Sequence, residues 1–198
     1  MAMSQKVWYR TAFVSISALS GNEVALQTRT TNLGWSGGFS DVEGLDTFAG
    51  KITRLATKDD IEITFDGIPV SHQDFDWLQA GQSAASTFSS GGAAITTSTD
   101  DTKYRIILLW TNQSSPTVTS ANQAITGTAE GYRRAWADCY MTSLDGDMSA
   151  GDNLTATMAF KTSAVDDNGV NNWAVWAKDT TSGTLSALNA YTSSTTKW

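Results

Sequence analysis

The chain has few of the residues on which reactive or metal-binding sites are most often built. Its 198 residues include one cysteine, Cys139, one histidine, His72, and two prolines. A single cysteine excludes an intrachain disulfide. One cysteine and one histidine are also too few for the usual zinc site, which needs four such ligands or three with an open position. We expect no metal at either residue.

Positive charge is also scarce. The chain has 13 Lys and Arg residues against 20 Asp and Glu residues, so its net charge is −7. A protein that grips nucleic acid through phosphates needs a basic surface, which this composition argues against. An acidic surface along which nucleic acid passes without binding remains compatible with it.

Long apolar runs are absent. The residues after Met1 lead directly into strand-like sequence without an apolar signal core, and no run is long enough to span a membrane. We therefore expect a soluble protein made in a cytoplasm, with no membrane partner.

The sequence does contain alternating strand patterns. In residues 154–160, Leu154, Met158 and Phe160 fall on one face, and the threonines fall on the other. Residues 61–65 repeat this alternation. A period of two residues predicts strands with one buried face.

Similar patterns extend over most of the chain. They predict a single mainly β domain over residues 1–198, either a β-sandwich or a rolled antiparallel sheet. Residues 106–109 are continuously apolar, which predicts burial on both faces. The first two strands should form a hairpin, and the third and fourth a strand–turn–strand unit around residues 57–60. The expected strands are 6–17, 23–30, 51–56, 61–65, 103–110, 135–141, 154–160 and 173–178.

One short helix is expected beside these strands. Ser71 can cap the amide of Asp74, as in a capping box, and Gly81 is a natural stop, so the helix should cover residues 71–81. The Ser- and Gly-rich residues 83–102 predict a flexible connection.

Residues 34–50 lack clear periodicity and predict a long loop. The loop contains Trp35, Phe39, Leu45 and Phe48. Exposed aromatic residues in such a loop would be costly, so we expect it to pack on a neighbouring subunit.

Candidate catalytic motifs lack their required context. Gly34-Trp35-Ser36-Gly37-Gly38 matches the nucleophile elbow of hydrolases, which needs a strand before the serine and a helix after it. A glycine-rich loop follows instead, and His72 is the only available base. A pair of carboxylates for glycoside hydrolysis stays open, because the sequence does not show distances in space. We predict that the protein is not an enzyme.

Two acidic segments resemble fragments of calcium loops. They are Asp145-Gly146-Asp147 and residues 166–169. A calcium loop beginning at Asp145 needs a carboxylate at its twelfth position, where Ala156 stands. Both segments are more typical of turns, so we predict no metal and no cofactor.

The chain has eight tryptophans, which is many for its length. They are compatible with sugar stacking, with anchoring of an interface, or with burial in a core. The sequence leaves these alternatives open.

Five segments together resemble the major tail tube proteins of long-tailed phages and related tailed viruses. Residues 50–56 and 60–67 resemble the paired strands of that family, and the capped helix 71–81 follows at the same place. Residues 131–140 and 151–161 resemble its closing strands. Their shared pattern is an aromatic residue and an aspartate in one strand, followed by Gly-Asp and an alternating strand that ends in Phe-Lys.

The resemblance implies a structural virion protein. Six copies would form a ring whose strands join into a β-barrel, and stacked rings would form a tail tube that conducts the viral genome during ejection. DNA would pass without specific binding, and Glu62 and Thr64 would face the channel. Partners would be the tape measure, tail terminator and tail tip proteins. The location would be the virion tail, assembled in the host cytoplasm. The alternative function is a non-catalytic carbohydrate-binding β-sandwich module.

Overall fold

The computed structural model describes residues 12–19, 23–26, 33–37, 39–46, 50–58, 60–67, 103–113, 124–147, 155–179 and 184–198. Within these ranges the chain forms ten strands and no helix, so the prediction of a mainly β protein is confirmed. The expected helix 71–81 and the expected connection 83–102 lie outside the described residues. In the described part of the chain no helix is long and apolar enough to cross a membrane.

The strands have the following bounds: β1 Ala12–Ala18, β2 Glu23–Leu26, β3 Leu33–Ser36, β4 Phe39–Asp46, β5 Gly50–Lys58, β6 Ile61–Gly67, β7 Tyr104–Thr111, β8 Gly131–Asp147, β9 Thr155–Thr162 and β10 Trp173–Lys178.

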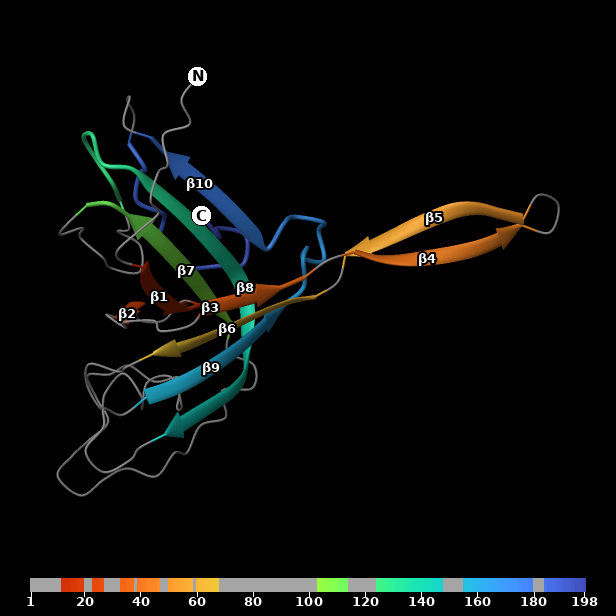
Figure 1. The fold of residues 1–198 in the computed structure, drawn as a ribbon, viewed down its shortest axis with the longest axis horizontal. Helices are drawn as coiled ribbons and strands as arrows, with labels where there is room; N and C mark the ends of the chain where they lie inside the picture. The colour runs from red at the N-terminus through yellow and green to blue at the C-terminus, as the bar shows by residue number, and fades with distance from the viewer. Residues whose placement is uncertain are drawn as a thin grey trace, which may run out of the picture.

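Eight of these strands belong to one hydrogen-bonded sheet (Figure 1). The order is β2-β1-β7-β8-β9-β6-β3, and β10 pairs with β8 outside this path. All of the pairings are antiparallel, and β1 and β2 form the expected hairpin. Strands β4 and β5 pair only with each other, in a separate two-stranded sheet.

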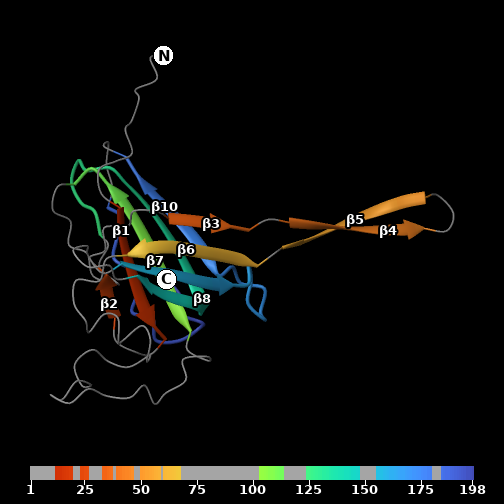
Figure 2. The same ribbon diagram turned by 60° about the horizontal axis from the view of Figure 1, so that its bottom comes forward.

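The long strand β8 divides this sheet into two layers. Residues 131–139 of β8 pair with β7, and residues 131–136 also pair with β10. Residues 140–147 pair with β9 instead. Between these halves Asp138 has a φ of 51°, a left-handed conformation that few non-glycine residues adopt. The strand turns a corner there, so that β3, β6 and β9 cross β1 and β7 (Figure 2).

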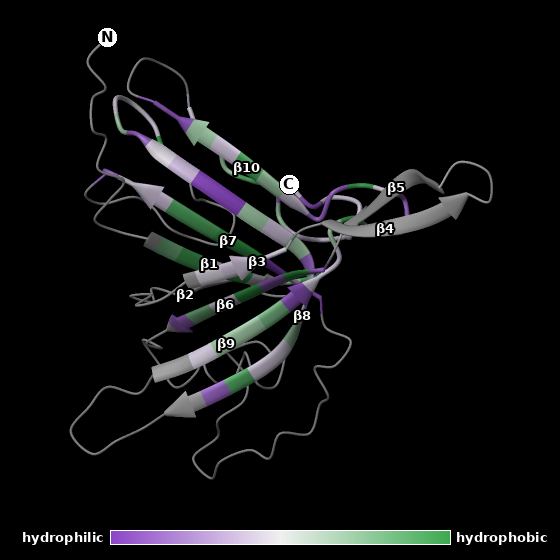
Figure 3. Ribbon diagram, turned by 45° about the vertical axis from the view of Figure 1, so that its right-hand side comes forward, coloured by the Kyte–Doolittle hydropathy of each residue, from purple (hydrophilic) through white to green (hydrophobic). Residues whose placement is uncertain are grey.

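The hydrophobic core lies between the two layers. Ile63 and Phe65 of β6, together with Phe160 of β9, pack against Ile106 and Leu108 of β7, and all five are buried. On β6 the intervening Glu62 and Thr64 are exposed, so the predicted alternation is confirmed. In Figure 3 the strand β7, which contributes to this core, is coloured green over much of its length because its residues are hydrophobic.

Strand β7 is buried on both faces, as its continuous apolar run predicts. Ile107 and Leu109 point away from the core between the layers. The C-terminal segment 184–198 covers them, with Leu188 packed in the cluster of Ile107 and Leu185 in that of Leu109. The last fifteen residues therefore form a third layer without regular strands.

The prediction of a loop over residues 34–50 is wrong for most of that segment. Residues 33–36 form β3, which pairs with β6, and residues 39–46 form β4, which pairs with β5. The β4–β5 hairpin extends away from the sheet (Figure 1). Since β4 belongs to no larger sheet, no core imposes an apolar alternation on it.

The expected strand–turn–strand unit around residues 57–60 is also wrong in its pairing. Both strands exist, but β5 pairs with β4, whereas β6 pairs with β3 and β9. The predicted turn at residues 145–147 is strand as well, because β8 continues to Asp147 and pairs with β9.

Candidate functional site

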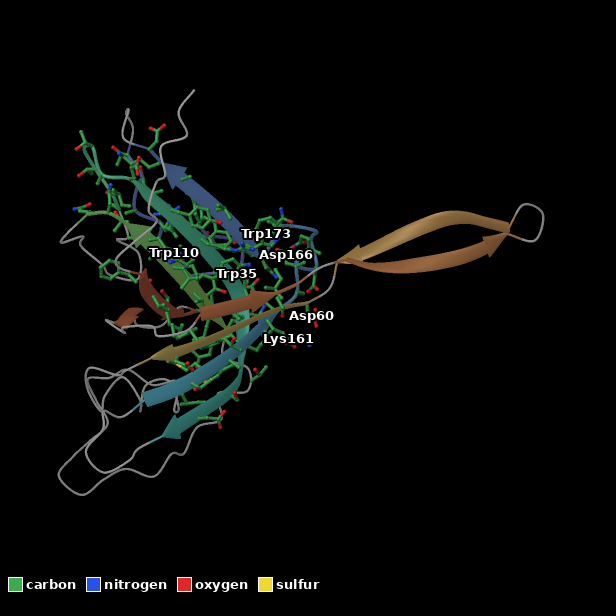
Figure 4. The ribbon with its side chains drawn as sticks, viewed as in Figure 1. Trp35, Asp60, Trp110, Lys161, Asp166 and Trp173 are labelled. Atoms are coloured by element: carbon green, nitrogen blue, oxygen red, sulfur yellow. The ribbon has the colours of Figure 1, made fainter. Side chains whose placement is uncertain are left out.

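The cluster of aromatic rings around Arg134 is the most distinctive surface in the described part of the chain (Figure 4). The guanidinium carbon of Arg134 lies 4.6 Å from the ring centroid of Trp35, 5.1 Å from that of Trp136 and 5.6 Å from that of Trp173. Trp35 also lies edge-on to Trp110 at 6.2 Å. These residues come from β3, β7, β8 and β10, so both layers contribute.

Strand register explains why the rings meet. Trp35 pairs with the buried Ile63, which turns its side chain toward the opposite layer. There Arg134 pairs with Val175, and Trp136 pairs with Trp173. The strands β3 and β10 are edge strands of their layers, since each is hydrogen-bonded to only one other strand among the described residues. The cluster therefore lies where the sandwich is open.

Three side chains of this cluster remain accessible. Trp35 is 42% exposed, Trp173 36% and Val175 40%. Together with Arg134 they form what we call the open aromatic face, made of Trp35, Arg134, Trp173 and Val175. This clustering of accessible apolar side chains makes the face the candidate site of interaction.

For the other residues expected in the inter-subunit segment the structure gives at most a position in the strand register. Phe39 and Leu45 stand at the start and near the end of β4, at register positions opposite Lys58 and Lys51. Phe48 lies outside the described residues. Trp35 is thus the only one of the four whose side chain the structure describes.

The two residues expected to face a channel lie on the exposed side of β6. Lys161 of β9 contacts both Asp60, at 3.3 Å, and Glu62, at 3.8 Å. Nearby, the hydroxyl of Thr157 donates to Asp66 at 2.8 Å. This face of β6 and β9 is polar, and the register keeps Glu62 and Thr64 out of the core.

A buried polar network joins the C-terminal segment to the corner of β8. The amine of Lys197 donates to Asn172 at 2.6 Å and to Asp166 at 2.7 Å, and it lies 3.5 Å from Asp138. The hydrogen bond from Lys197, followed by those from the backbone N–H groups of Val170 and Asn168, holds the pKa of Asp166 below its usual range. Lys197 thereby has three partners that compensate its burial.

Two arginines fix the same segment against the outer face of β7 and β8. Arg105 donates to the carbonyls of Asn189, at 2.7 Å, and Lys197, at 3.0 Å. Arg133 donates to the carbonyl of Ser186 at 2.6 Å and stacks over Trp176 at 4.4 Å. Burial, and to a lesser extent the charge of Arg105, lowers the pKa of Arg133 to about 10.

Sequence reasoning did not single out these arginines, Lys197 or Arg134. The available signal was a charged residue inside a strand that is otherwise apolar, as at Arg105 in β7. Buried charges need partners, so such a residue predicts a covering segment.

The structure describes only one of the two candidate catalytic residues. Ser36 is exposed at the end of β3, and His72 lies outside the described residues. Within the described ranges no group of three His, Cys, Asp or Glu side chains is arranged to hold a metal ion. Residues 166–169 form the expected turn, in which the carboxylate of Asp166 accepts from the N–H groups of Asn168 and Val170.

Comparison with known proteins gives structural resemblance without sequence similarity. No family model matches the chain, and no curated protein matches it. Solved structures that it resembles include a chain of the sheath/tube terminator of the extracellular contractile injection system PVC in its extended state. That chain is 12% identical at a TM-score of 0.49, over 88% of this chain and 99% of that one.

Two further resemblances are of the same order. A chain of the tube-terminating cap of the anti-feeding prophage is 10% identical at a TM-score of 0.47, over 90% of this chain and 97% of that one. An Hcp protein is 9% identical at a TM-score of 0.36, over 88% and 98%.

Proposed function

We propose that this protein is the structural subunit of a tail tube, in which hexameric rings stack around a channel. The observation that carries the proposal is the open margin of the sandwich, where two edge strands flank the open aromatic face. The sequence resemblance of residues 50–67, 131–140 and 151–161 to tail tube proteins supports it.

The edge strands favour a closed assembly. Strands β3 and β10 end their layers, and an unpaired edge exposes backbone donors and acceptors that readily pair with another chain. Joining edges around a ring removes them for every subunit at once, and cyclic symmetry lets identical copies do so. Among the described strands of one subunit neither edge has a second partner, and the rings of Trp35 and Trp173 stay partly exposed.

The β4–β5 hairpin suits contact with a neighbouring ring or subunit. Its eight-residue strand β4 spans about 26 Å at the usual rise of a β-strand. It leaves the body of the domain directly after β3, within a few residues of Trp35. In the proposal Trp35, Phe39, Leu45 and Phe48 belong to this contact.

The polar face of β6 and β9 is the proposed wall of the channel. Glu62 and Thr64 are exposed there, and the net charge of −7 disfavours binding of nucleic acid. In the proposal the channel conducts a viral genome during ejection without specific binding. The tape measure, tail terminator and tail tip proteins are its partners in a virion tail.

A carbohydrate-binding module is the second candidate, favoured by the exposed indoles of Trp35 and Trp173. Aromatic side chains of this kind stack on sugar rings. Arg134 already covers one face of Trp35, which leaves less of that ring for a sugar.

Light scattering of the purified protein, combined with negative-stain electron microscopy, separates the two candidates. We expect a particle mass that is a multiple of the 21.2 kDa chain, with rings or hollow tubes of uniform width. A monomer at all concentrations that binds polysaccharide would favour the second candidate.

A further inference from the structure

The open aromatic face concentrates the accessible apolar surface of the described chain. Among the described residues five large hydrophobic side chains are exposed, and three of them, Trp35, Trp173 and Val175, lie around Arg134. Trp35 and Trp173 both lie against Arg134, and Figure 4 labels them near each other. Their clustering distinguishes this margin from surface residues that are exposed singly.

Arg134 defines what this face can recognise. Among the described residues no carboxylate lies within ion-pair distance of it, and its Nε has no hydrogen-bond partner. The indoles of Trp35 and Trp136 pack against the guanidinium. Its Nε is buried, so a ligand would reach Arg134 through the terminal nitrogens. A planar guanidinium edge matches a carboxylate in geometry and charge.

We propose that the open aromatic face binds the β4 strand of a second copy of this chain, through a carboxylate on Arg134. This inference rests on the proposed function and names the contact that the tube subunits make. Strand β4 carries Asp41, Glu43 and Asp46, three acids in eight residues. The hairpin extends away from its own sheet, so the face that β4 meets belongs to another copy (Figure 1).

The register of the hairpin identifies the most suitable carboxylates. In the register Glu43 stands opposite the basic residue Arg54, whereas Asp41 stands opposite Ala56 and Asp46 opposite Gly50. Asp41 and Asp46 therefore have no charged residue directly opposite in the hairpin. A sugar is a poorer occupant of the face, because its hydroxyls do not neutralise Arg134.

A cysteine trap tests the contact with Arg134 in place. One full-length chain carries Val175→Cys, and a second carries Asp41→Cys, Glu43→Cys or Asp46→Cys. The native Cys139 is fully buried and stays in every chain. After mixing and mild oxidation we expect a disulfide-linked heterodimer with at least one β4 cysteine. The control replaces Val175→Cys by Lys161→Cys, an exposed position on β9. Cross-linking no better than this control for all three positions would overturn the proposal.

Substitution of the cation gives an independent measurement. We expect Arg134→Gln to weaken self-association at least about tenfold, as expected for a central interface arginine, and Lys161→Gln to leave it unchanged. Circular dichroism and thermal melting establish that each variant is folded. Rings formed equally well by folded Arg134→Gln would overturn the contact and leave the proposed function standing. A trapped heterodimer without rings would support the contact and contradict the tube.

The exposure of Trp35 in the monomer shows whether the open aromatic face is free to bind a second copy or is already covered by another part of the same chain. In the dilute protein we expect acrylamide to quench the part of the tryptophan fluorescence that comes from Trp35. The Trp35→Phe variant identifies this part, because it lacks it. This quenching should fall on association. A Trp35 that is already shielded in the monomer would mean that the same chain covers the face, which would overturn the proposal.

Discussion

The hydroxyl of Tyr191 donates to Oδ1 of Asp138 at 2.5 Å and accepts the backbone N–H of the same residue at 3.0 Å. Asp138 is the residue with a φ of 51° at the corner of β8. One side chain of the C-terminal segment thus satisfies two buried polar groups at the point where the sheet divides into its layers. Since an uncommon backbone conformation persists only where its surroundings stabilise it, this contact is expected to stabilise the fold.

Removing the hydroxyl should destabilise the protein. We expect Tyr191→Phe to lower the free energy of unfolding by about 1–3 kcal/mol, because it leaves the buried N–H and carboxylate of Asp138 without this partner. Urea denaturation measures the change. Tyr140→Phe, two residues beyond the corner and 40% exposed, is the matched control and should stay within about 0.5 kcal/mol of wild type. Equal effects of the two substitutions would contradict the role of Tyr191.

The same tyrosine predicts a loss of stability at alkaline pH. Burial, and then the hydrogen bond with Asp138, raises the pKa of Tyr191 far above its ordinary value. A raised folded-state pKa gives stability that is complete below the unfolded-state value of about 10 and is lost as pH rises above it. Unfolding free energies between pH values of about 8 and about 11 should therefore fall, and Tyr191→Phe should reduce that slope. An unchanged slope in the variant would show that other groups cause the loss.

Asp166 predicts a separate loss at acid pH. Its pKa is lowered by the hydrogen bond from Lys197 first and by the N–H of Val170 next. A lowered folded-state pKa gives stability that is present above the unfolded-state value of about 3.9 and is lost as pH falls through the folded value. Asp166→Asn should therefore be less stable near neutral pH and less sensitive to acid. The comparison is made by urea unfolding at about pH 7 and at about pH 3. The same acid sensitivity in the variant would contradict this assignment.

The alternation along β6 gives a test of the core. Ile63→Ala should lower the free energy of unfolding by about 2–5 kcal/mol, because it removes buried methyl groups and leaves a cavity between the layers. Thr64→Ala on the exposed face of the same strand is the control, with an expected change within about 0.5 kcal/mol. Chemical denaturation of both variants decides the point. A loss at Thr64 as large as that at Ile63 would mean that the faces of β6 are reversed.

Alternation and apolar runs predicted the strands that form the core. The alternate residues of 61–65 and of 158–160, and all of 106–109, are buried as their patterns indicate, because these strands contact another layer on one face or on both. Apart from the first hairpin, the sequence did not predict which strands pair with each other. Nothing in residues 51–56 indicates that they pair with β4 instead of β6, since both choices satisfy the same local pattern.

The candidate site was predicted only in part. Trp35 was singled out for its aromatic ring in a segment without periodicity, and it lies on the open aromatic face. Arg134 was missed because either of the adjacent Arg133 and Arg134 could face solvent until their neighbours on the other strands are known. The C-terminal segment was missed for a similar reason, since its few apolar residues do not reveal on their own that Leu185 and Leu188 cover the outer face of β7.

A cryo-electron microscopy reconstruction of the assembled wild-type protein tests the central claim most directly. The account predicts a hollow tube of stacked rings, with Glu62 and Thr64 on the wall of the channel and the β4–β5 hairpin in contact with another subunit. A reconstruction in which β6 faces the outside of the particle would contradict the assignment of the channel wall. A protein that forms no ring or tube at any concentration would contradict the proposal that it is a tube subunit.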